Sequence, residues 1–278
     1  MYRVVQDIGG RRAIERAARA AEGQARQVEG VVRDMRRGLQ NAAEMRTACH
    51  ELATMHRGAT ADERTRAGAA GAVEAVVGAM RAHAAEADVQ DEACAALVKI
   101  TKHSPQNKVR AGAAGALEAV VAAMQAHVGA QNVQETGCGA LANMANNIPQ
   151  NVARAGAVGA VDVVVGTMRA HAGTAGVQQN GCAALQCMTK SSPQNRVLAG
   201  AAGALEAVVG AMRAHAGVAG VQENGCAALA NLATSSPQNR VLAGAVGAPE
   251  AVVGAIQAHA GAAGVQKHGR HALAQLRA

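Results

Sequence analysis

The sequence carries a strict internal repeat with a period of 44 residues. A Val-Gln pair recurs at this step, beginning at Val89, Val133, Val177, Val221 and Val265. Histidines, leucines, Pro-Gln-Asn triplets and AGAxGA boxes keep the same step, and no insertion breaks the register from residue 67 onward. A fixed period of about 20 to 50 residues is typical of repeat proteins, in which each unit buries its apolar face against its neighbours. We therefore expect a stacked array and not a single central core.

A degenerate copy of the unit precedes the regular ones. The segment EGVVRDM at residues 29–35 aligns with EAVVGAM at residues 206–212. Cys49 lies 45 residues before Cys94, so the first junction is one residue longer than the period. The sequence thus predicts about six repeats. After a basic leader at residues 1–15 come a degenerate first repeat at 16–60 and five regular repeats at 61–104, 105–148, 149–192, 193–236 and 237–278.

Each regular unit is expected to form three helices. In SSPQNRVLAGA, Ser192 suits an N-cap and Pro193 suits the first helical position, where its missing N–H would have been unpaired. Apolar residues spaced i, i+3, i+4 and i+7 in ALEAVVGAMRAH predict the second helix, and VQENGCAALANLAT predicts the third. Glycine recurs in the third helix at a cost of about 1 kcal/mol relative to Ala, so we expect a close helix contact at Gly137, Gly181 and Gly225. The expected core stripes of the fifth repeat are Leu205, Val208, Val209 and Met212 on its second helix and Val221, Gly225, Ala228, Leu229 and Leu232 on its third.

Composition favours a helical array and argues against several other classes. The 278 residues include one aromatic side chain, Tyr2, which disfavours β-sandwiches and the aromatic platforms that stack nucleic-acid bases. The net charge of +7 is compatible with an acidic partner without requiring one. Six regularly spaced cysteines in a chain of this length indicate reduced thiols. No apolar run reaches the length of a signal peptide or a membrane span, so we expect a location in the cytoplasm or the nucleus.

Motifs that suggest chemistry at first sight have structural explanations. The histidine that ends each second helix, such as His83, suits a helix C-terminus, and no carboxylate or thiol recurs beside it to complete a metal site. Cys49, His50 and Glu51 are adjacent on one helix and point in different directions, so they cannot form a catalytic relay. The glycine boxes lack the strand and the Lys-Ser/Thr pair of a phosphate-binding loop. We expect no enzyme activity, metal or cofactor, because near-identical repeats supply no unique cluster of acid, base and nucleophile.

The unit resembles the armadillo repeat. The segment NRVLAGAAGALEAVV and the later VQENGCAALANLA, within residues 195–233, carry an asparagine-led first helix, an Ala-Gly-Ala box, an apolar second helix and a Val-Gln-led third helix. This resemblance covers nearly the whole chain. It implies a right-handed α-solenoid of about six armadillo-like repeats that acts as a non-enzymatic protein-interaction scaffold. It also implies that the third helices line a concave groove in which an extended peptide segment of a partner protein lies.

Carried onto this sequence, the resemblance implies three rows of groove positions on the third helices. The first row is Thr47, Glu92, Thr136, Asn180, Asn224 and His268. The second row is His50, Ala95, Gly139, Ala183, Ala227 and His271. The third row, where the family often places an asparagine that bonds a peptide backbone, is Thr54, Lys99, Asn143, Cys187, Asn231 and Gln275. Importin-alpha-like members carry tryptophan in the second row, so the small residues here argue against a basic nuclear-localisation peptide as the ligand.

Two other functions also fit the sequence. Nucleic acid could bind an N-terminal basic cluster, although interleaved acidic residues favour a solvated helix face. The chain also stops directly after the last third helix with no capping helix, which fits a spacer fragment of a larger multidomain protein. The sequence identifies neither a particular partner nor an oligomeric state. The cluster consists of Arg11, Arg12, Arg16, Arg19, Arg33, Arg36 and Arg37.

Overall fold

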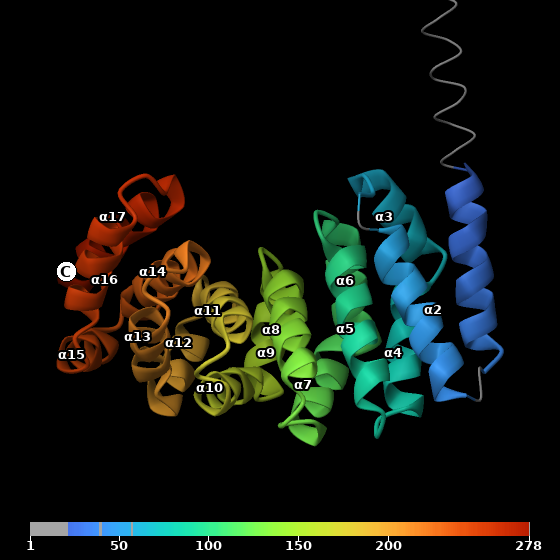
Figure 1. The fold of residues 1–278 in the computed structure, drawn as a ribbon, viewed down its shortest axis with the longest axis horizontal. Coiled ribbons are helices and arrows are strands. Elements are labelled where there is room, and N and C mark those ends of the chain that lie inside the picture. The colour runs from blue at the N-terminus through green and yellow to red at the C-terminus, as the bar shows by residue number, and fades with distance from the viewer. Residues whose placement is uncertain (1–21, 39–40, 57, 278) are drawn as a thin grey trace, which may run out of the picture.

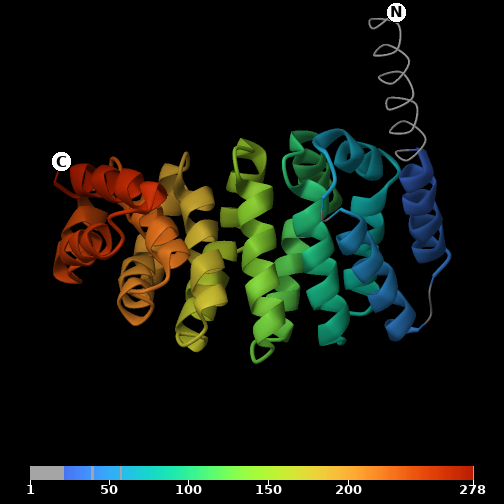
Figure 2. The same cartoon turned by 45° about the horizontal axis from the view of Figure 1, so that its top comes forward.

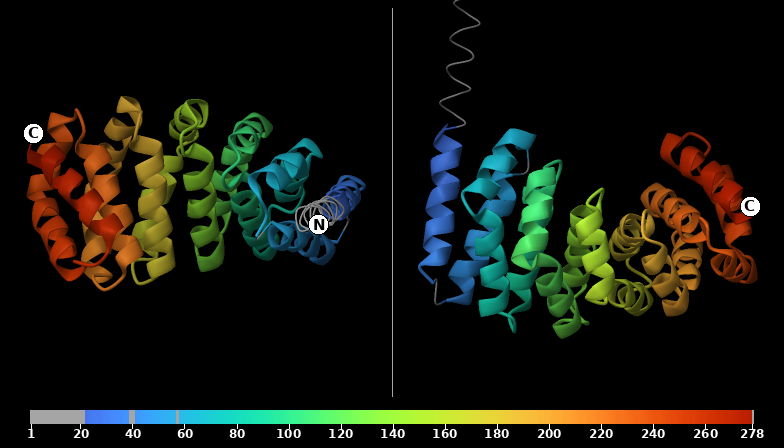
Figure 3. Two further views of the ribbon diagram at one scale, coloured as in Figure 1. Left: turned by 90° about the horizontal axis from the view of Figure 1, so that it is seen from above. Right: turned by 180° about the vertical axis from the view of Figure 1, so that it is seen from behind.

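The computed structural model describes residues 22–38, 41–56 and 58–277. These residues form a curved stack of short helices in which neighbouring segments of the chain lie side by side along the long axis (Figure 1). Figures 2 and 3 show the same order from other directions. No strand occurs within these described ranges. The all-α solenoid expected from the repeat is therefore confirmed.

The helices follow the repeat. Residues 22–36 are helical and precede α2 (Ala42–Met55), in the places of the second and third helices of the first repeat. The first helix expected for that repeat lies outside the described residues. Five triplets follow, and their bounds are α3 (Ala61–Ala69), α4 (Ala72–Ala82), α5 (Ala87–Thr101); α6 (Pro105–Ala114), α7 (Ala116–Ala126), α8 (Gln131–Ala145); α9 (Pro149–Ala157), α10 (Ala160–Ala170), α11 (Ala175–Thr189); α12 (Pro193–Ala202), α13 (Ala204–Ala214), α14 (Ala219–Ala233); and α15 (Pro237–Ala245), α16 (Ala248–Ala258), α17 (Ala263–Arg277).

The first helix of most regular repeats begins with the predicted cap. The side chains of Ser104, Ser192 and Ser236 each accept a hydrogen bond from the backbone N–H three residues further on, and a proline follows in the first turn. Thr60 forms a capping box at the start of α3. α9 differs, because Ile148 stands at its N-cap and offers no side-chain acceptor. A proline alone is thus enough to mark the start of that helix.

The two glycines of each AGAxGA box have different roles. The second glycine makes the turn between the first and second helices, and Gly115 has a φ of 79°, in the left-handed region that favours glycine. The first glycine makes room for the next repeat, because a Cβ on Gly112 would lie 2.0 Å from Oδ1 of Asn151. The box therefore combines a turn with a socket for the asparagine of the following Pro-Gln-Asn triplet.

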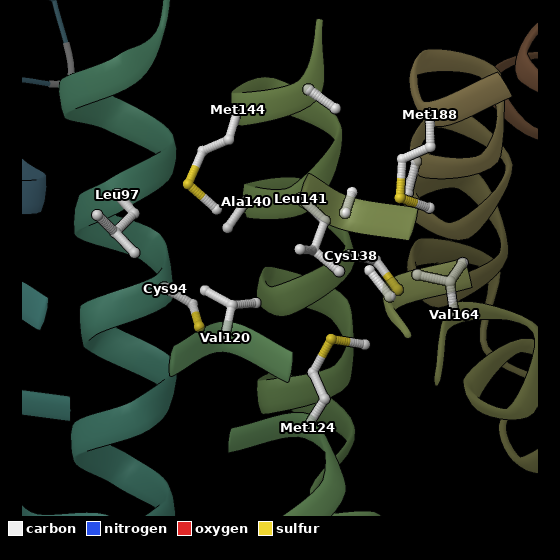
Figure 4. Packing of buried hydrophobic residues seen from close by; sticks show 14 of the residues in the cluster. Cys94, Leu97, Val120, Met124, Cys138, Ala140, Leu141, Met144, Val164 and Met188 are labelled. Atoms are coloured by element: carbon white, nitrogen blue, oxygen red, sulfur yellow. The ribbon is translucent and has the colours of Figure 1, made fainter. Parts of the chain in front are cut away.

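The second and third helices form the core as expected. Leu205, Val208 and Met212 are at most 2% exposed, and Figure 4 shows equivalent residues of neighbouring repeats packed between helices. The close contact predicted at the third-helix glycines is confirmed, because a Cβ on Gly181 would lie 2.6 Å from Cγ of Met168. In three repeats a methionine (Met124, Met168 or Met212) thus packs against a third-helix glycine, and in the last repeat Ile256 packs against Gly269 in the same way.

A buried asparagine joins the first helices α6, α9, α12 and α15 to the preceding repeat. Nδ2 of Asn195 donates to the carbonyl oxygens of Val152, at 2.8 Å, and Met188, at 2.9 Å. Asn151 and Asn239 bond the equivalent carbonyls of their own neighbours. These side chains are almost fully buried, so a lost partner would leave a polar group without water or protein to bond it. The asparagine therefore fixes the register of one repeat on the next.

A glutamine and a histidine form a second joint at the other end of the unit. Nε2 of Gln178 donates to the carbonyl oxygens of Met168 and His171, both at 2.9 Å, and so caps the second helix. His171 is the predicted C-cap residue. Its Nε2 lies 2.7 Å from the carbonyl oxygen of Val128 in the preceding repeat. Because a carbonyl accepts, this nitrogen carries the proton. Among the described residues, His127, His215 and His259 make the same bond.

Several cations also bond to helix ends. Nη2 of Arg169 lies 2.8 Å from the carbonyl oxygen of Ala202, at the end of the next first helix. Arg81 and Arg213 make the equivalent contact in their own neighbours. Buried Arg196 donates to the carbonyl oxygen of Thr189, at 3.0 Å, near the end of α11. Positive charge thus offsets the partial negative charge of helix C-termini.

The helices are short, as a stack of compact units requires. Second helices have 11 residues and regular third helices have 15. In the part of the chain that the structure describes, no single helix has the length and apolarity to cross a membrane. Two bent pairs, α12 with α13 (68°) and α15 with α16 (70°), pass that test on length and composition alone.

The cysteines occupy two different environments. Cys138 and Cys182 are 0% exposed, and burial raises the pKa of each thiol to about 12. Cys49, Cys94 and Cys226 are buried in equivalent positions. The extra cysteine of α11, Cys187, is half-buried. Burial also raises the pKa of Cys187, but Lys108 and Lys190 oppose that shift.

Replacing Gly156 with Ala should destabilise the chain. The new Cβ would lie 2.0 Å from Oδ1 of Asn195 and would drive this side chain off its two carbonyl partners. We expect the free energy of unfolding to fall by about 2 kcal/mol. Gly244→Ala is the matched control, because its Cβ would meet no atom within 4 Å and Ala favours the helix by about 1 kcal/mol. Urea unfolding followed by circular dichroism measures both variants, and equal stabilities would contradict the socket.

Only one thiol should react quickly with a disulfide reagent such as DTNB in the folded protein. The five core thiols are buried and stay protonated, whereas Cys187 is accessible. Stopped-flow absorbance at mildly alkaline pH should show a fast phase of one thiol per chain. Cys187→Ser should remove this phase, and Cys182→Ser should keep it. A second fast thiol in the Cys187→Ser variant would show that the core opens more readily than the packing indicates.

Candidate groove on the third helices

The third helices form one continuous face of the array. α2, α5, α8, α11, α14 and α17 pack against one another in that order, and Figure 3 shows the stack from above and from behind. Most side chains of the three predicted rows are exposed or half-buried, whereas the core stripes on the same helices are buried. The rows therefore share a face directed away from the second helices.

The middle of this face is hollowed. A hollow of about 430 Å³ lies across α5, α8 and α11. Ala95, Gly139 and Ala183 of the second row line it, so no bulky side chain fills its floor. It also brings together five residues predicted from the first and third rows, namely Lys99, Thr136, Asn143, Asn180 and Cys187. Sequence reasoning missed five further lining residues that extend or flank the rows: Val98, Lys102, Glu135, Ala142 and Asn146.

The groove asparagines bond within the array. Nδ2 of Asn143 donates to the carbonyl oxygen of Val98 in the preceding third helix, at 2.9 Å. Nδ2 of Asn180 makes the same contact with the carbonyl oxygen of Glu135, at 3.0 Å. Asn224 and Asn231 repeat it one unit further on. Each bond spans 45 residues, so the four amides tie successive third helices together.

This bonding fixes how each amide is presented. The hydrogen bond from the NH₂ group to a backbone carbonyl fixes the orientation of the amide. The side-chain oxygen is therefore held in one position and is not used in that bond. A carboxamide oxygen accepts hydrogen bonds, so α8, α11 and α14 offer acceptors on this face. The sequence could show that amides recur here. It could not show which half of each amide is already engaged, because the carbonyl partner belongs to another repeat.

The N-terminal end of the face is partly closed by contacts of its own. Nδ1 of His50 lies 3.1 Å from both carboxylate oxygens of Glu92 in the next repeat. The hydroxyls of Thr47 and Thr54 donate to backbone carbonyls of their own helix, α2. The structure therefore brings His50 and Glu92 together and leaves the two threonines exposed without a neighbouring repeat as partner.

The C-terminal end departs from the predicted pattern at one residue. Ala227 is 4% exposed, although the second row was expected to be accessible along its length. Ala227 therefore belongs to the buried part of α14, which packs between α11 and α17. Gln275 accepts a hydrogen bond from Thr234 at 3.2 Å. His271 is exposed and His268 is half-buried.

Acidic residues lie at the N-terminal ends of the third helices. Asp91 accepts a hydrogen bond from the hydroxyl of Thr136 at 3.0 Å, and burial raises the pKa of its carboxyl. The carboxylate of Glu135 lies over Gly176 in the first turn of α11, where a Cβ would come within 2.3 Å of it. Glu223 lies in the same way over Gly264 of α17. Helix N-termini stabilise such carboxylates.

The N-terminal arginine cluster is described only in part. Arg33, Arg36 and Arg37 lie in the described residues, whereas Arg11, Arg12, Arg16 and Arg19 lie outside them. Arg36 donates to the carbonyl oxygen of Ala70, at 3.3 Å, in the manner of Arg81 and Arg169. Arg36 thus contributes to a repeat joint. Within the described ranges, no group of three or more His, Cys, Asp or Glu side chains is arranged to hold a metal ion.

Solved structures share this architecture. An engineered protein superposes with a TM-score of 0.79 at 23% sequence identity, covering 90% of this chain and 96% of its own. A designed armadillo repeat protein reaches 0.75 at 22% identity, covering 90% and 99% of the two chains. Another, in complex with the peptide (KR)4, reaches 0.73 at 21% identity with the same coverage. These similarities show the fold. The comparison with curated proteins gave no match.

The family follows from a comparison of sequence. A family model described as the LRRK2 ARM repeat matches residues 113–278, which is more than half of the chain. Armadillo repeats form a scaffold fold that is typically non-catalytic. The match covers the hollow's α8 and α11 and the joints made by Asn151, Asn195 and Asn239. The chain therefore belongs to the armadillo repeat family, with its sequence match in the LRRK2 ARM repeat.

Proposed function

We propose that the chain is a non-enzymatic protein-interaction scaffold that binds an extended peptide segment of a partner along the face of its third helices. The observation that carries this proposal is a set of four asparagine amides on this face, two from the first row and two from the third. Asn143, Asn180, Asn224 and Asn231 each donate to the preceding third helix and present the side-chain oxygen. An extended peptide exposes backbone N–H groups that such oxygens accept.

The hollow supplies the space that a peptide backbone requires. The hollow is lined by the small residues Ala95, Gly139 and Ala183. The main chain of a peptide can therefore approach the third helices closely. The amide oxygens are held before any ligand arrives, which reduces the ordering that binding costs on the protein side. A designed armadillo repeat protein of the same fold is in complex with a peptide, which supports this type of ligand.

Nucleic acid is the weaker candidate. Its support was the basic N-terminal cluster, and Arg36 of that cluster already bonds the end of a neighbouring helix. Binding of this kind would fall steeply with salt, because it depends on release of counterions from phosphates. Free, mostly buried cysteines accord with a reducing compartment. We therefore favour a peptide ligand in the cytoplasm or nucleus.

Filling the hollow should abolish peptide binding without unfolding the chain. We would select ligands for the intact protein from a phage-displayed library of random dodecapeptides and measure their dissociation constants by fluorescence anisotropy. Ala183→Arg places a long side chain on the floor of the hollow and should weaken the selected peptides at least about tenfold. Ala122→Arg is the matched control, because Ala122 is an exposed residue of α7 outside the hollow.

The two variants also define the contradicting result. Peptides that bind Ala183→Arg as tightly as the unaltered protein would place their site outside the third-helix face. A library that yields no peptide above background would argue against the scaffold function itself. Thermal unfolding of both variants checks that the substitutions leave the fold intact.

A further inference from the structure

Two lysines that line the hollow form no ion pair within the described residues. Lys99 is a half-buried residue of the third row, and Lys102 is the exposed C-cap residue of α5. Both line the hollow. Within the described residues neither ammonium lies within 4.0 Å of a carboxylate. The nearby Lys108 and Lys190 differ, because they donate to Asn146 and Asn147.

The acidic residues of the same face are already engaged. Asp91 accepts from Thr136, Glu92 pairs with His50, and the carboxylate of Glu135 lies against the first turn of α11. They also lie at the opposite ends of the third helices. Glu92 precedes Lys99 by seven residues of α5, which is about 10 Å at 1.5 Å per residue. This separation exceeds the screening length of about 8 Å at physiological salt, so Glu92 interacts only weakly with Lys99. Glu135 also lines the hollow, but its carboxylate lies against Gly176 in the first turn of α11.

We propose that the hollow is a subsite for an acidic side chain of the bound segment, either a carboxylate or a phosphate group. This inference rests on the proposed function, because the acidic group arrives as part of an extended peptide. Its backbone N–H donates to Oδ1 of Asn143. The stem of its side chain lies over Ala95 and Gly139, and its anionic group lies near the ammonium groups of Lys99 and Lys102.

The arrangement implies a preference opposite to that of a structural neighbour. The designed armadillo repeat protein is in complex with a peptide of alternating lysine and arginine. In this chain the same peptide would place cations beside Lys99 and Lys102. Like charges disfavour that complex, and the small second-row residues offer no rings over which a lysine or arginine stem could lie.

The test uses peptides selected from the random dodecapeptide library on the intact protein. We expect one position of the selected peptides to be enriched in Asp or Glu. A synthetic peptide with this residue changed to Gln should bind about tenfold more weakly. A peptide with phosphoserine at the same position separates the two sources of negative charge. Tighter binding than that of the Asp or Glu peptide would indicate a phosphorylated partner, and weaker binding would indicate a carboxylate.

Variants of the protein assign the effect to the two lysines. The double variant Lys99→Ala and Lys102→Ala should bind the acidic peptide about tenfold more weakly and should no longer distinguish it from the Gln peptide. The control Lys267→Ala removes an exposed cation of α17 outside the hollow and should leave the affinity unchanged. The charge-reversed variant Lys99→Glu and Lys102→Glu should prefer a peptide with Lys at the same position.

The outcomes separate this inference from the function on which it rests. Selected peptides that lack acidic residues, or that bind the double alanine variant at full affinity, would overturn the acidic subsite. If Ala183→Arg still blocked those peptides, peptide binding on the third-helix face would stand. If the library yielded no ligand, both proposals would fall.

Discussion

Each joint between repeats depends on side-chain amides that bond to backbone carbonyls near helix ends. An α-helix leaves its last four carbonyls without an internal partner, and helices of 9 to 15 residues make such ends frequent. Asn195 supplies a donor to the carbonyl oxygen of Met188 in the preceding repeat, and Gln178 supplies one to that of Met168 in its own repeat. Because these donors must reach main chain, residues beside them have to be small. The abundance of glycine and alanine therefore follows from the way the repeats are joined.

The same kind of bond organises the functional face. Asn143 and Asn231 donate to the third helix before them, as the first-helix asparagines do at the buried joint. On this face the amide is half-buried and its oxygen stays available. Each groove asparagine thus bonds the neighbouring repeat and, in the proposed function, presents an acceptor to the peptide. Replacing one with Ala would change both properties, which is why Ala183 is the sharper position at which to test binding.

Much of the fold could be predicted from the sequence, because period, caps and apolar stripes are local signals. Ser192 and Pro193 mark a helix start, and Gly181 marks a close contact, within their own unit. The groove rows could be placed in the same way, since position on a helix decides their face. The sequence could not predict that the NH₂ group of Asn143 bonds the carbonyl oxygen of Val98, or that His171 bonds Val128. It also could not predict that Ala227 is buried. Each depends on a partner in a neighbouring repeat and on how closely two helices approach, which differs along the stack.

The first-helix joints are kept from repeat to repeat, whereas the third-helix face differs between repeats. A first-helix asparagine must fit the glycine and the carbonyls of the unit before it, so it recurs from Asn107 to Asn239. A third-row residue faces the groove, and this row changes from Lys99 through Asn143 to Cys187. Recognition of a particular sequence must come from positions that vary, since identical units offer every register of a peptide the same contacts. The hollow across α5, α8 and α11, where charge, amide and small residues meet, is therefore the place where a ligand's register would be set.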